Sequence, residues 1–320
     1  MTAPLFHLEP GALDDAAPGS VITLTGAEAH HAHTVMRLGP GESIQLSDTR
    51  IRRISGVIRS AEAGVVTVEV SHLSIEPAEQ PQLVLVQALA KDKRDLQGIE
   101  SATELGVDRI IPWEAERSVA QWKPGREAKK HAEWVNTVTA AAKQTRRTSI
   151  PQVEPLHRTG EYVQRVEETG AGVVVLHERE NRPLRQVLED LGLIDRQPPL
   201  AHAQVAQSQV IRSQVGQNVP GQNRIGQNQA AQNQAGQSQA GQNHAGRPQS
   251  ADHGLARPLH QLHVVVGPEG GITDREIERF RAVGAHTARL GPTVLRSSTA
   301  GPAAVAAVQV LLGRWDRPTR

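Results

Sequence analysis

The chain has 320 residues, and its 35 Lys and Arg nearly balance its 34 Asp and Glu, so the net charge of +1 says nothing global about a nucleic-acid partner. It has no cysteine, which excludes disulfides, thiolate catalysis and cysteine-based zinc sites. The fourteen histidines show no metal-ligand spacing, and no apolar run approaches the length of a membrane span. We therefore expect a cytoplasmic protein of two domains, without metal, membrane segment or signal peptide.

Residues 1–75 have the composition of a small β domain. Gly and Pro separate short runs of strand-forming residues, and the spacing is typical of a barrel. A helical turn is expected at Ala27–Met36, followed by a turn at Gly39–Glu42. The expected strands are Val21–Leu24, Ser43–Leu46, Arg53–Ile58 and Val65–Val70.

Residues 76–320 change to alternating strands and helices, which predicts an α/β domain with a largely parallel sheet. Strands are expected at Leu83–Leu89, Arg109–Trp113 and Gly172–Leu176. A helix follows the first strand and ends at Leu105 before Gly106. A long helix is expected over Glu127–Arg147, with its apolar side formed by Ala132, Val135, Val138 and Ala142.

The stretch from about 196 to 259 differs from the rest of this domain. From Gly216 it contains six pentapeptides of the type GQNQA, with almost no apolar side chain. Burial cannot offset chain entropy in such a segment. We predict a disordered insertion between a helix and the next strand.

A glycine-rich turn follows the apolar strand His263–Val266. The sequence Gly-Pro-Glu-Gly-Gly at Gly267–Gly271 cannot continue a strand, and it brings bare backbone close to whatever lies beyond the strand end. Thr273 and Glu276 form a capping box for a helix that should end at Gly284. That helix has an apolar face of Ile277, Phe280 and Val283.

A second strand, about His286–Leu290, ends in another tight turn at Gly291 and Pro292. Ser298 or Thr299 is then expected to cap a final helix that runs to Leu312. Ligands of open α/β sheets bind at the carboxyl ends of the strands, so the two Gly-Pro turns should face one crevice. The carboxylate of Glu269 would repel a phosphate there, and both the G-x-G-x-x-G and the G-x-x-x-x-G-K-[ST] motifs are absent.

The segments VVVGPEGG and LGPTVLRSSTA together resemble the ribosomal RNA small-subunit methyltransferase E family of the SPOUT class. The segments ATELGV at Ala102–Val107 and ERSVA at Glu116–Ala120 add to this resemblance. It implies an N-terminal PUA-like, RNA-binding β-barrel and a C-terminal α/β domain with a trefoil knot, a rare exception among folds. It also implies S-adenosylmethionine as cofactor, 16S ribosomal RNA of the small subunit as partner, and a homodimer.

The resemblance also assigns roles to individual residues. The implied cofactor-binding residues are Leu176, His177, Val266, Gly267, Pro268, Glu269, Gly270, Gly271, Leu290, Gly291, Val294, Leu295 and Ser297. The family usually reads Leu-Arg-Thr-Glu-Thr-Ala where this chain has Leu-Arg-Ser-Ser-Thr-Ala, so Ser298 stands at the acidic position and no carboxylate role is carried over.

Six residues are candidates for RNA contacts: His31, Arg37, Lys91, Arg94, Gln144 and Arg147. Arg37 is the better candidate in residues 1–75 because other arginines surround it, whereas a lone histidine beside a turn is more often structural. The loop Lys91–Arg94 is either a solvated loop or an RNA-facing patch, and its place at a strand end favours the patch. Two interpretations of the basic residues at the end of the long helix stay open. They either complement the partial negative charge of the helix C-terminus or face the substrate.

The resemblance implies methylation of N3 of a uridine in 16S ribosomal RNA. The protein must align donor and acceptor and favour the deprotonated base. Arg296 is the catalytic candidate, because it can stabilise charge on the ring carbonyl oxygens but stays protonated and cannot act as a base. The alternatives are a SPOUT methyltransferase with another RNA target, a non-catalytic RNA-binding protein, and a small-molecule nucleotide enzyme, which Glu269 argues against.

Overall fold

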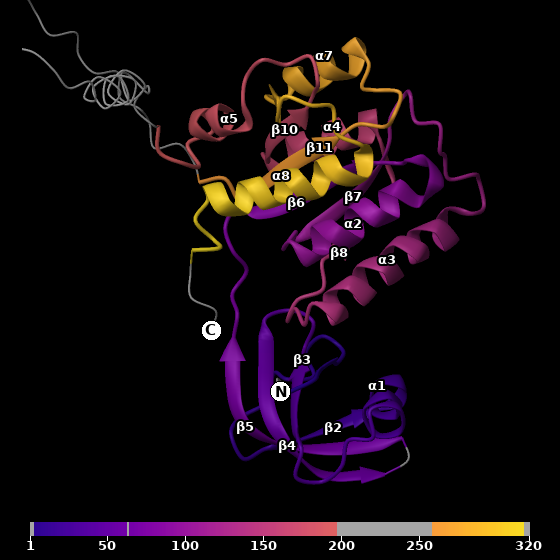
Figure 1. Ribbon diagram of the computed structural model, residues 1–320, viewed down its shortest axis with the longest axis vertical. Coiled ribbons are helices and arrows are strands. Elements are labelled where there is room, and N and C mark those ends of the chain that lie inside the picture. The colour runs from indigo at the N-terminus through magenta and orange to yellow at the C-terminus, as the bar shows by residue number, and fades with distance from the viewer. Residues whose placement is uncertain (1–2, 63, 197–257, 317–320) are drawn as a thin grey trace, which may run out of the picture. The chain divides into compact units, whose positions relative to one another are not determined.

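The computed structural model describes residues 3–62, 64–196 and 258–316, and it contains two separate sheets (Figure 1). The first sheet uses strands from residues 5–75 and the second uses strands from residues 82–288. The predicted insertion lies almost entirely outside the described residues, so its disorder stays a prediction.

The first sheet has five strands in the order β1-β3-β4-β5-β2. β4 and β5 form a long antiparallel hairpin in which alternate residues point inward, so that Val66, Val68 and Val70 are buried. The four expected strands are confirmed, and β1, a three-residue strand parallel to β3, was missed. The bounds are β1 Leu5–His7, β2 Val21–Thr25, β3 Ser43–Ser47, β4 Arg52–Glu62 and β5 Val65–Ile75.

The expected helical turn in this region is also confirmed. It consists of α1 (Gly26–His30) and a π-helical turn, η1 (His31–Val35). Arg37 follows with φ of 57°, a left-handed conformation that is uncommon for a residue with a side chain. π-Helical turns are rare and are often found at functional sites, so His31 and Arg37 lie in an unusual piece of backbone.

The second sheet runs in the order β12-β10-β11-β6-β7-β8, with β9 also paired to β7, and every pair is parallel. Helices cover both faces, which explains the continuous apolar runs of β6, β10 and β11. The bounds are β6 Gln82–Ala88, β7 Arg109–Glu114, β8 Gln152–Val153, β9 His157–Arg158, β10 Gly172–Leu176, β11 Gln261–Val266 and β12 His286–Ala288.

Two apolar cores lie on the two faces of this sheet. In one, Leu83, Leu85 and Val264 pack with α2 (Arg94–Glu104), α3 (Glu127–Gln144), α5 (Leu184–Asp190) and α8 (Ser297–Leu311). In the other, Val84, Val86 and Val265 pack with α4 (Thr159–Thr169) and α7 (Asp274–Ala282). Neighbouring residues of a strand thus serve opposite cores, as the two-residue period of a strand requires.

The prediction for the long helix needs two corrections. α3 ends at Gln144 rather than Arg147, because the chain turns at Arg146, where φ is 55°. Its buried side is formed by Trp134, Val138, Ala141 and Ala142, whereas Ala132 and Val135 are exposed. The large Trp134 ring, packed edge-on against Trp122 with centroids 5.8 Å apart, sets which side of the helix faces inward.

The segment that follows α3 touches residues of the first sheet. Ser47 Oγ donates to Thr148 O, Ile150 N donates to Thr49 O at 3.1 Å, and Lys143 pairs with Glu28. The imidazole Nε2 of His7 lies 2.9 Å from Arg147 O. The basic end of α3 is therefore engaged in contacts within the chain. Among the described helices, none is long and apolar enough to cross a membrane.

Candidate active site

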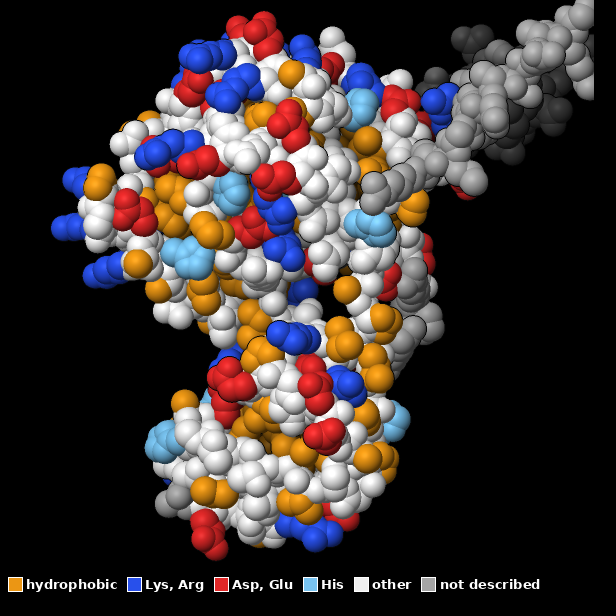
Figure 2. Space-filling view, turned by 180° about the vertical axis from the view of Figure 1, so that it is seen from behind, with side chains coloured by type: hydrophobic (Ala, Val, Ile, Leu, Met, Phe, Trp, Pro, Cys, Tyr) orange, Lys and Arg blue, Asp and Glu red, His pale blue; other side chains and the backbone are white. Residues whose placement is uncertain are grey.

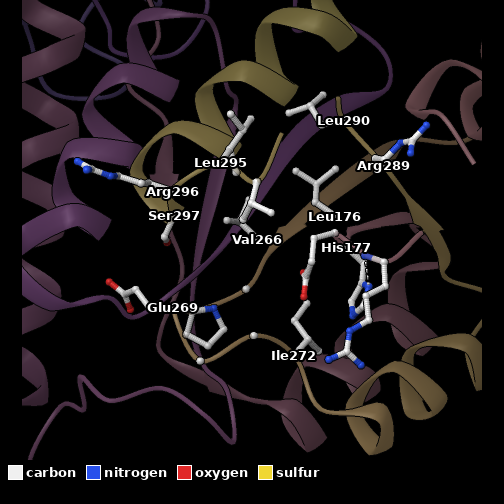
Figure 3. Close-up of a pocket in the computed structure, with 18 of the residues that line it drawn as sticks. Leu176, His177, Val266, Glu269, Ile272, Arg289, Leu290, Leu295, Arg296 and Ser297 are labelled. Atoms are coloured by element: carbon white, nitrogen blue, oxygen red, sulfur yellow. Dashed lines mark hydrogen bonds between the residues drawn. The ribbon is translucent and has the colours of Figure 1, made fainter. Parts of the chain in front are cut away.

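A cavity of about 640 Å³ opens at the carboxyl ends of β10, β11 and β12 (Figure 3). These three strands are neighbours and parallel, so their ends meet at one edge of the sheet. Both glycine-proline turns line the cavity, as the sequence predicted. We call them the first Gly-Pro loop (Gly267–Gly271) and the second Gly-Pro loop (Leu290–Arg296).

Close packing explains the glycines of the first Gly-Pro loop. A Cβ on Gly267 would lie 2.7 Å from Cγ1 of Ile272, and one on Gly270 would lie 2.8 Å from the carbonyl oxygen of Arg117. Gly271 has φ of 75°, which favours glycine. The backbone of this loop therefore forms part of the cavity wall, in a shape that larger residues would disturb.

A buried carboxylate fixes the end of this loop. The predicted capping box is confirmed, since Thr273 Oγ1 accepts from Glu276 N at 3.1 Å and Glu276 Oε2 accepts from Thr273 N at 3.0 Å. The other carboxylate oxygen, Oε1, accepts from Thr159 Oγ1 at 2.7 Å and from Glu116 N at 2.9 Å. Glu276 is fully buried and paired by these four groups, so it anchors the start of α7 beside the cavity.

The second Gly-Pro loop leads directly into α8. The predicted cap at Ser298 or Thr299 is wrong, because α8 begins at Ser297, and Arg296 occupies the N-cap position without a side-chain cap bond. A residue far away in the sequence sets this start, since Gln87 Nε2 of β6 donates to Ser297 Oγ at 2.7 Å. Ser298, at the position where the family has Glu, lies in the first turn of α8.

The end of β10 supplies the third side of the cavity. His177 N donates to Ala288 O at 3.0 Å, which joins this segment to β12, and Arg179 N donates to Nδ1 of His177 at 3.2 Å. In Figure 3 the side chains of Leu176, Leu290 and Leu295 lie around Val266. The cavity thus has an apolar side of aliphatic residues and a backbone side of glycines.

Charged groups lie on the other side of the cavity. In Figure 3 Arg296 and Glu269 lie together on the side opposite His177 and Arg289, and the guanidinium of Arg296 points away from Leu176. Glu269 Oε1 accepts from Lys91 N at 3.3 Å and lies 3.6 Å from Nη1 of Arg94. The loop Lys91–Arg94, which we call the basic loop, therefore adjoins the cavity.

All thirteen residues expected to bind the cofactor line this one cavity, and so does the catalytic candidate Arg296. Sequence reasoning missed Arg117, Ile272 and Arg289, which also line it, and Gln87, which holds the start of α8. Gln87 had a signal, because it is a single polar residue inside an apolar strand. Among the described residues, no cluster of three or more His, Asp or Glu could hold a metal ion.

The six RNA candidates are not brought together in one place. His31 and Arg37 are exposed in the first region, and the His31 ring packs edge-on against Phe6 with centroids 5.8 Å apart. Lys91 is exposed beside the cavity, and Gln144 is exposed at the end of α3. Arg147 points inward, because its Nη1 donates to Thr103 O at 2.7 Å and to Val107 O at 2.8 Å.

The exposed charges on one face of the molecule are mixed in sign. On the face shown in Figure 2, Lys and Arg side chains are interspersed with Asp and Glu. This mixture agrees with the net charge of +1. On that face, contacts to phosphate groups would therefore depend on short local segments.

Comparison with family models gives two matches along the chain. A model described as RNA methyltransferase domain matches residues 77–200 and 224–309, and one described as RNA methyltransferase PUA domain matches residues 24–71.

Curated relatives and solved structures agree with these matches. The ribosomal RNA small subunit methyltransferase E of Mycobacterium bovis is 33% identical over 319 residues, covering 99% of this chain and 95% of the relative. The protein of the same name from Bacillus subtilis is 24% identical over 298 residues, covering 92% and 93%.

The fold is similar to that of the Neisseria gonorrhoeae enzyme of that name, solved bound to S-adenosyl methionine, with a TM-score of 0.66 at 20% identity over 97% of this chain and 98% of that one. A structure of a methyltransferase from Legionella pneumophila, also in complex with this cofactor, gives a TM-score of 0.64 at 21% identity over 97% and 98%.

Proposed function

Because the chain belongs to the ribosomal RNA small subunit methyltransferase E family, we propose that it transfers a methyl group from S-adenosylmethionine to N3 of a uridine in 16S ribosomal RNA. The observation that carries this proposal is the single cavity formed by the two Gly-Pro loops and the end of β10. It combines an aliphatic side, glycine backbone and several arginines, among them Arg296.

The aliphatic and glycine residues of the cavity fit this cofactor. Leu176, Leu290 and Leu295 can pack against an adenine ring, and the glycine backbone of the first Gly-Pro loop can approach the ligand closely. Glu269 contributes its backbone to this wall of the cavity, and its carboxylate pairs with Arg94 of the basic loop. When bound, the cofactor supplies an electrophilic methyl group.

Arg296 is placed to act on the acceptor rather than on the cofactor. Its guanidinium points away from Leu176 in Figure 3, and it is exposed. A uridine that loses its N3 proton carries negative charge on its ring carbonyl oxygens, which a fixed guanidinium stabilises. We propose this role for Arg296, with the cavity holding the donor in line.

The RNA is proposed to contact His31 and Arg37 in the first region, and Lys91 and Gln144 in the second, whereas Arg94 pairs with Glu269. A match to a PUA domain model over residues 24–71 supports the first of these contacts. We leave Arg147 out, because its guanidinium bonds to two backbone carbonyls within the chain. N3 takes part in base pairing, so the target uridine must be unpaired or extruded.

Three finer features of the fold belong to the same proposal. Residues 1–75 form a PUA-like barrel and residues 76–320 form the catalytic domain. The chain around the carboxyl ends of the strands forms a trefoil knot. The close approach of two distant segments supports this proposal, since Arg289 N donates to Arg182 O at 2.7 Å and Leu184 N donates to Arg289 O at 3.1 Å. The proposed substrate places the enzyme in the cytoplasm.

We also propose a homodimer in which α8 is covered by a second copy. This helix is apolar on nearly every side, and Val310 remains 52% exposed. In Figure 1 no other element lies in front of α8. A helix that is apolar all round is normally buried, so a partner surface would complete its burial.

The test is the substitution Arg296→Ala, with Arg275→Ala on the exposed side of α7 as the control. Methylation of unmodified 30S subunits should fall by about a hundredfold or more for Arg296→Ala. Affinity for S-adenosylmethionine, measured by calorimetry, should stay within about twofold, since the guanidinium lies outside the donor side of the cavity. An equal loss of cofactor affinity would assign Arg296 to the cofactor, and mass-spectrometric mapping of the rRNA would identify the nucleotide.

A further inference from the structure

We propose that Glu269 is a positioning residue whose carboxylate holds the basic loop in the shape that contacts RNA. This inference rests on the proposed function and adds to it a physical link between the cofactor cavity and the RNA surface. The backbone of Glu269 is part of the first Gly-Pro loop, whereas its side chain contacts the basic loop.

The contacts of the carboxylate lead to this assignment. Glu269 Oε1 accepts from Lys91 N at 3.3 Å and lies 3.6 Å from Nη1 of Arg94. Arg94 Nη2 also lies 3.8 Å from Oδ2 of Asp92, so the guanidinium bridges two carboxylates. In Figure 3 the Glu269 carboxylate points away from Leu176 and His177. It thus ties down both ends of the basic loop from outside that loop.

The basic loop needs such an external hold because its backbone is strained. Asp92 has φ of 55° and ψ of 32°, and Lys93 has φ of 58° and ψ of 23°. Residues other than glycine visit this left-handed region singly and at a cost, and two in succession persist only where the surroundings enforce them. Neither of these two positions is a glycine, the residue that adopts this conformation without strain.

The strained shape presents the charges of the loop to solvent. Lys91 and Lys93 are both exposed, and Arg94, with its side chain 37% exposed, turns back to Glu269. Asp95 anchors the other flank by accepting from Ala90 N at 3.4 Å and from Leu96 N at 2.8 Å. With both flanks fixed, the two lysines stand at defined positions beside the cavity, where they can meet the phosphates around an extruded nucleotide.

This arrangement has an electrostatic consequence that separates it from a simpler account. If Glu269 acted on RNA only through its charge, its removal would strengthen RNA binding, because a negative group would leave the surface. If Glu269 acts by holding the loop, its removal weakens RNA binding although the surface becomes more basic. The two accounts therefore predict opposite signs.

The experiment measures RNA and cofactor affinities separately for Glu269→Ala, with Glu278→Ala on the exposed side of α7 as the matched control. We expect Glu269→Ala to weaken binding of unmodified 30S subunits, and to raise their KM, by about tenfold, while the cofactor Kd changes by less than about twofold. Arg94→Ala should have a similar effect, and the double variant should be no worse than either single variant.

A second variant tests the strain itself. Asp92→Gly removes the backbone penalty at position 92, so in the Glu269→Ala background it should restore part of the RNA affinity, by more than the gain that the same substitution gives in the wild type through its lost negative charge. A general disturbance of the fold would not be repaired by this glycine. Unchanged or tighter RNA binding by Glu269→Ala, an equal loss of cofactor affinity, or no rescue by Asp92→Gly would each overturn the inference. A wild-type protein that failed to bind 30S subunits would instead overturn the proposed function.

Discussion

The two basic segments of the catalytic region, the basic loop Lys91–Arg94 and the α3 end segment Lys143–Arg147, look alike in the sequence but differ in the structure. Both adjoin a helix terminus, and both contain a residue in the left-handed conformation. The basic loop lies beside the cavity with two exposed lysines, whereas the α3 end segment bonds to α1, to α2 and to the first sheet. Local charge therefore does not reveal whether a segment serves a ligand or the fold.

The largest expected effect comes from Arg147→Ala. The guanidinium of Arg147 donates to Thr103 O and Val107 O. In the alanine variant both carbonyl oxygens lose this hydrogen bond. We expect the free energy of unfolding to fall by about 2–4 kcal/mol. Chemical denaturation measures this change. The folded variant should bind RNA as the wild type does, and a selective loss of RNA affinity with full stability would reverse our comparison.

The double substitution Lys91→Ala and Lys93→Ala should weaken RNA binding and leave the stability almost unchanged. Both side chains are exposed, so stability should change by less than about 0.5 kcal/mol. RNA affinity should fall, and the slope of log K against log salt should become shallower by about two, one unit for each lost phosphate contact. Filter binding at several salt concentrations provides the slope. An unchanged slope would show that these lysines contact no phosphate.

The pH dependence of the Arg147→Ala penalty gives a smaller effect. Burial raises the pKa of Asp108 above its ordinary value of 3.8, and the charge of Arg147 opposes that rise. A carboxyl group with a raised pKa contributes stability that is complete below 3.8 and is lost as the pH rises through the folded pKa.

Removing Arg147 raises the pKa of Asp108 further. In the variant, the stability that comes from the protonated carboxyl group is therefore larger at low pH and is lost only at a higher pH. The penalty of Arg147→Ala should therefore be smaller just above pH 4 than after the carboxyl group of Asp108 has titrated. Unfolding measured between pH 4 and about pH 8 checks this difference. Asp108→Asn should abolish the trend, and a trend that survives in that background would have another origin.

Lys143→Ala should have the smallest effect. Its ion pair with Glu28 joins two side chains that are 40% and 19% exposed, and such pairs contribute less than about 1 kcal/mol. Differential scanning calorimetry should show a small shift in Tm that shrinks in high salt. We expect no change in RNA affinity, and a clear loss would add Lys143 to the proposed RNA contacts beside Gln144.

Sequence reasoning succeeded where a feature depends on neighbouring residues. The capping box of Thr273 and Glu276 and the turn at Gly267–Gly271 are written in a few consecutive positions, and both were located correctly. The crevice at the strand ends followed from the parallel pattern, which is a general rule of such sheets.

The failures have one physical cause, which is contact between distant parts of the chain. The start of α8 is set by Gln87, 210 residues before Ser297. The buried side of α3 is set by Trp134 and its ring partner Trp122. For Arg147 the sequence leaves open whether it complements the helix terminus or faces substrate, because its bonds to Thr103 and Val107 leave no local trace in the sequence.

The central place of β11 has a consequence for synthesis of the protein. This strand lies between β6 and β10, yet it is made only after the 61 residues from 197 to 257, which the ribosome takes about 3–12 s to translate. During that interval β6 and β10 cannot pair through their missing neighbour, and each has an open edge prone to non-native association. Protection of the nascent chain in this window, by a chaperone or by the ribosome surface, would therefore govern the yield of folded enzyme.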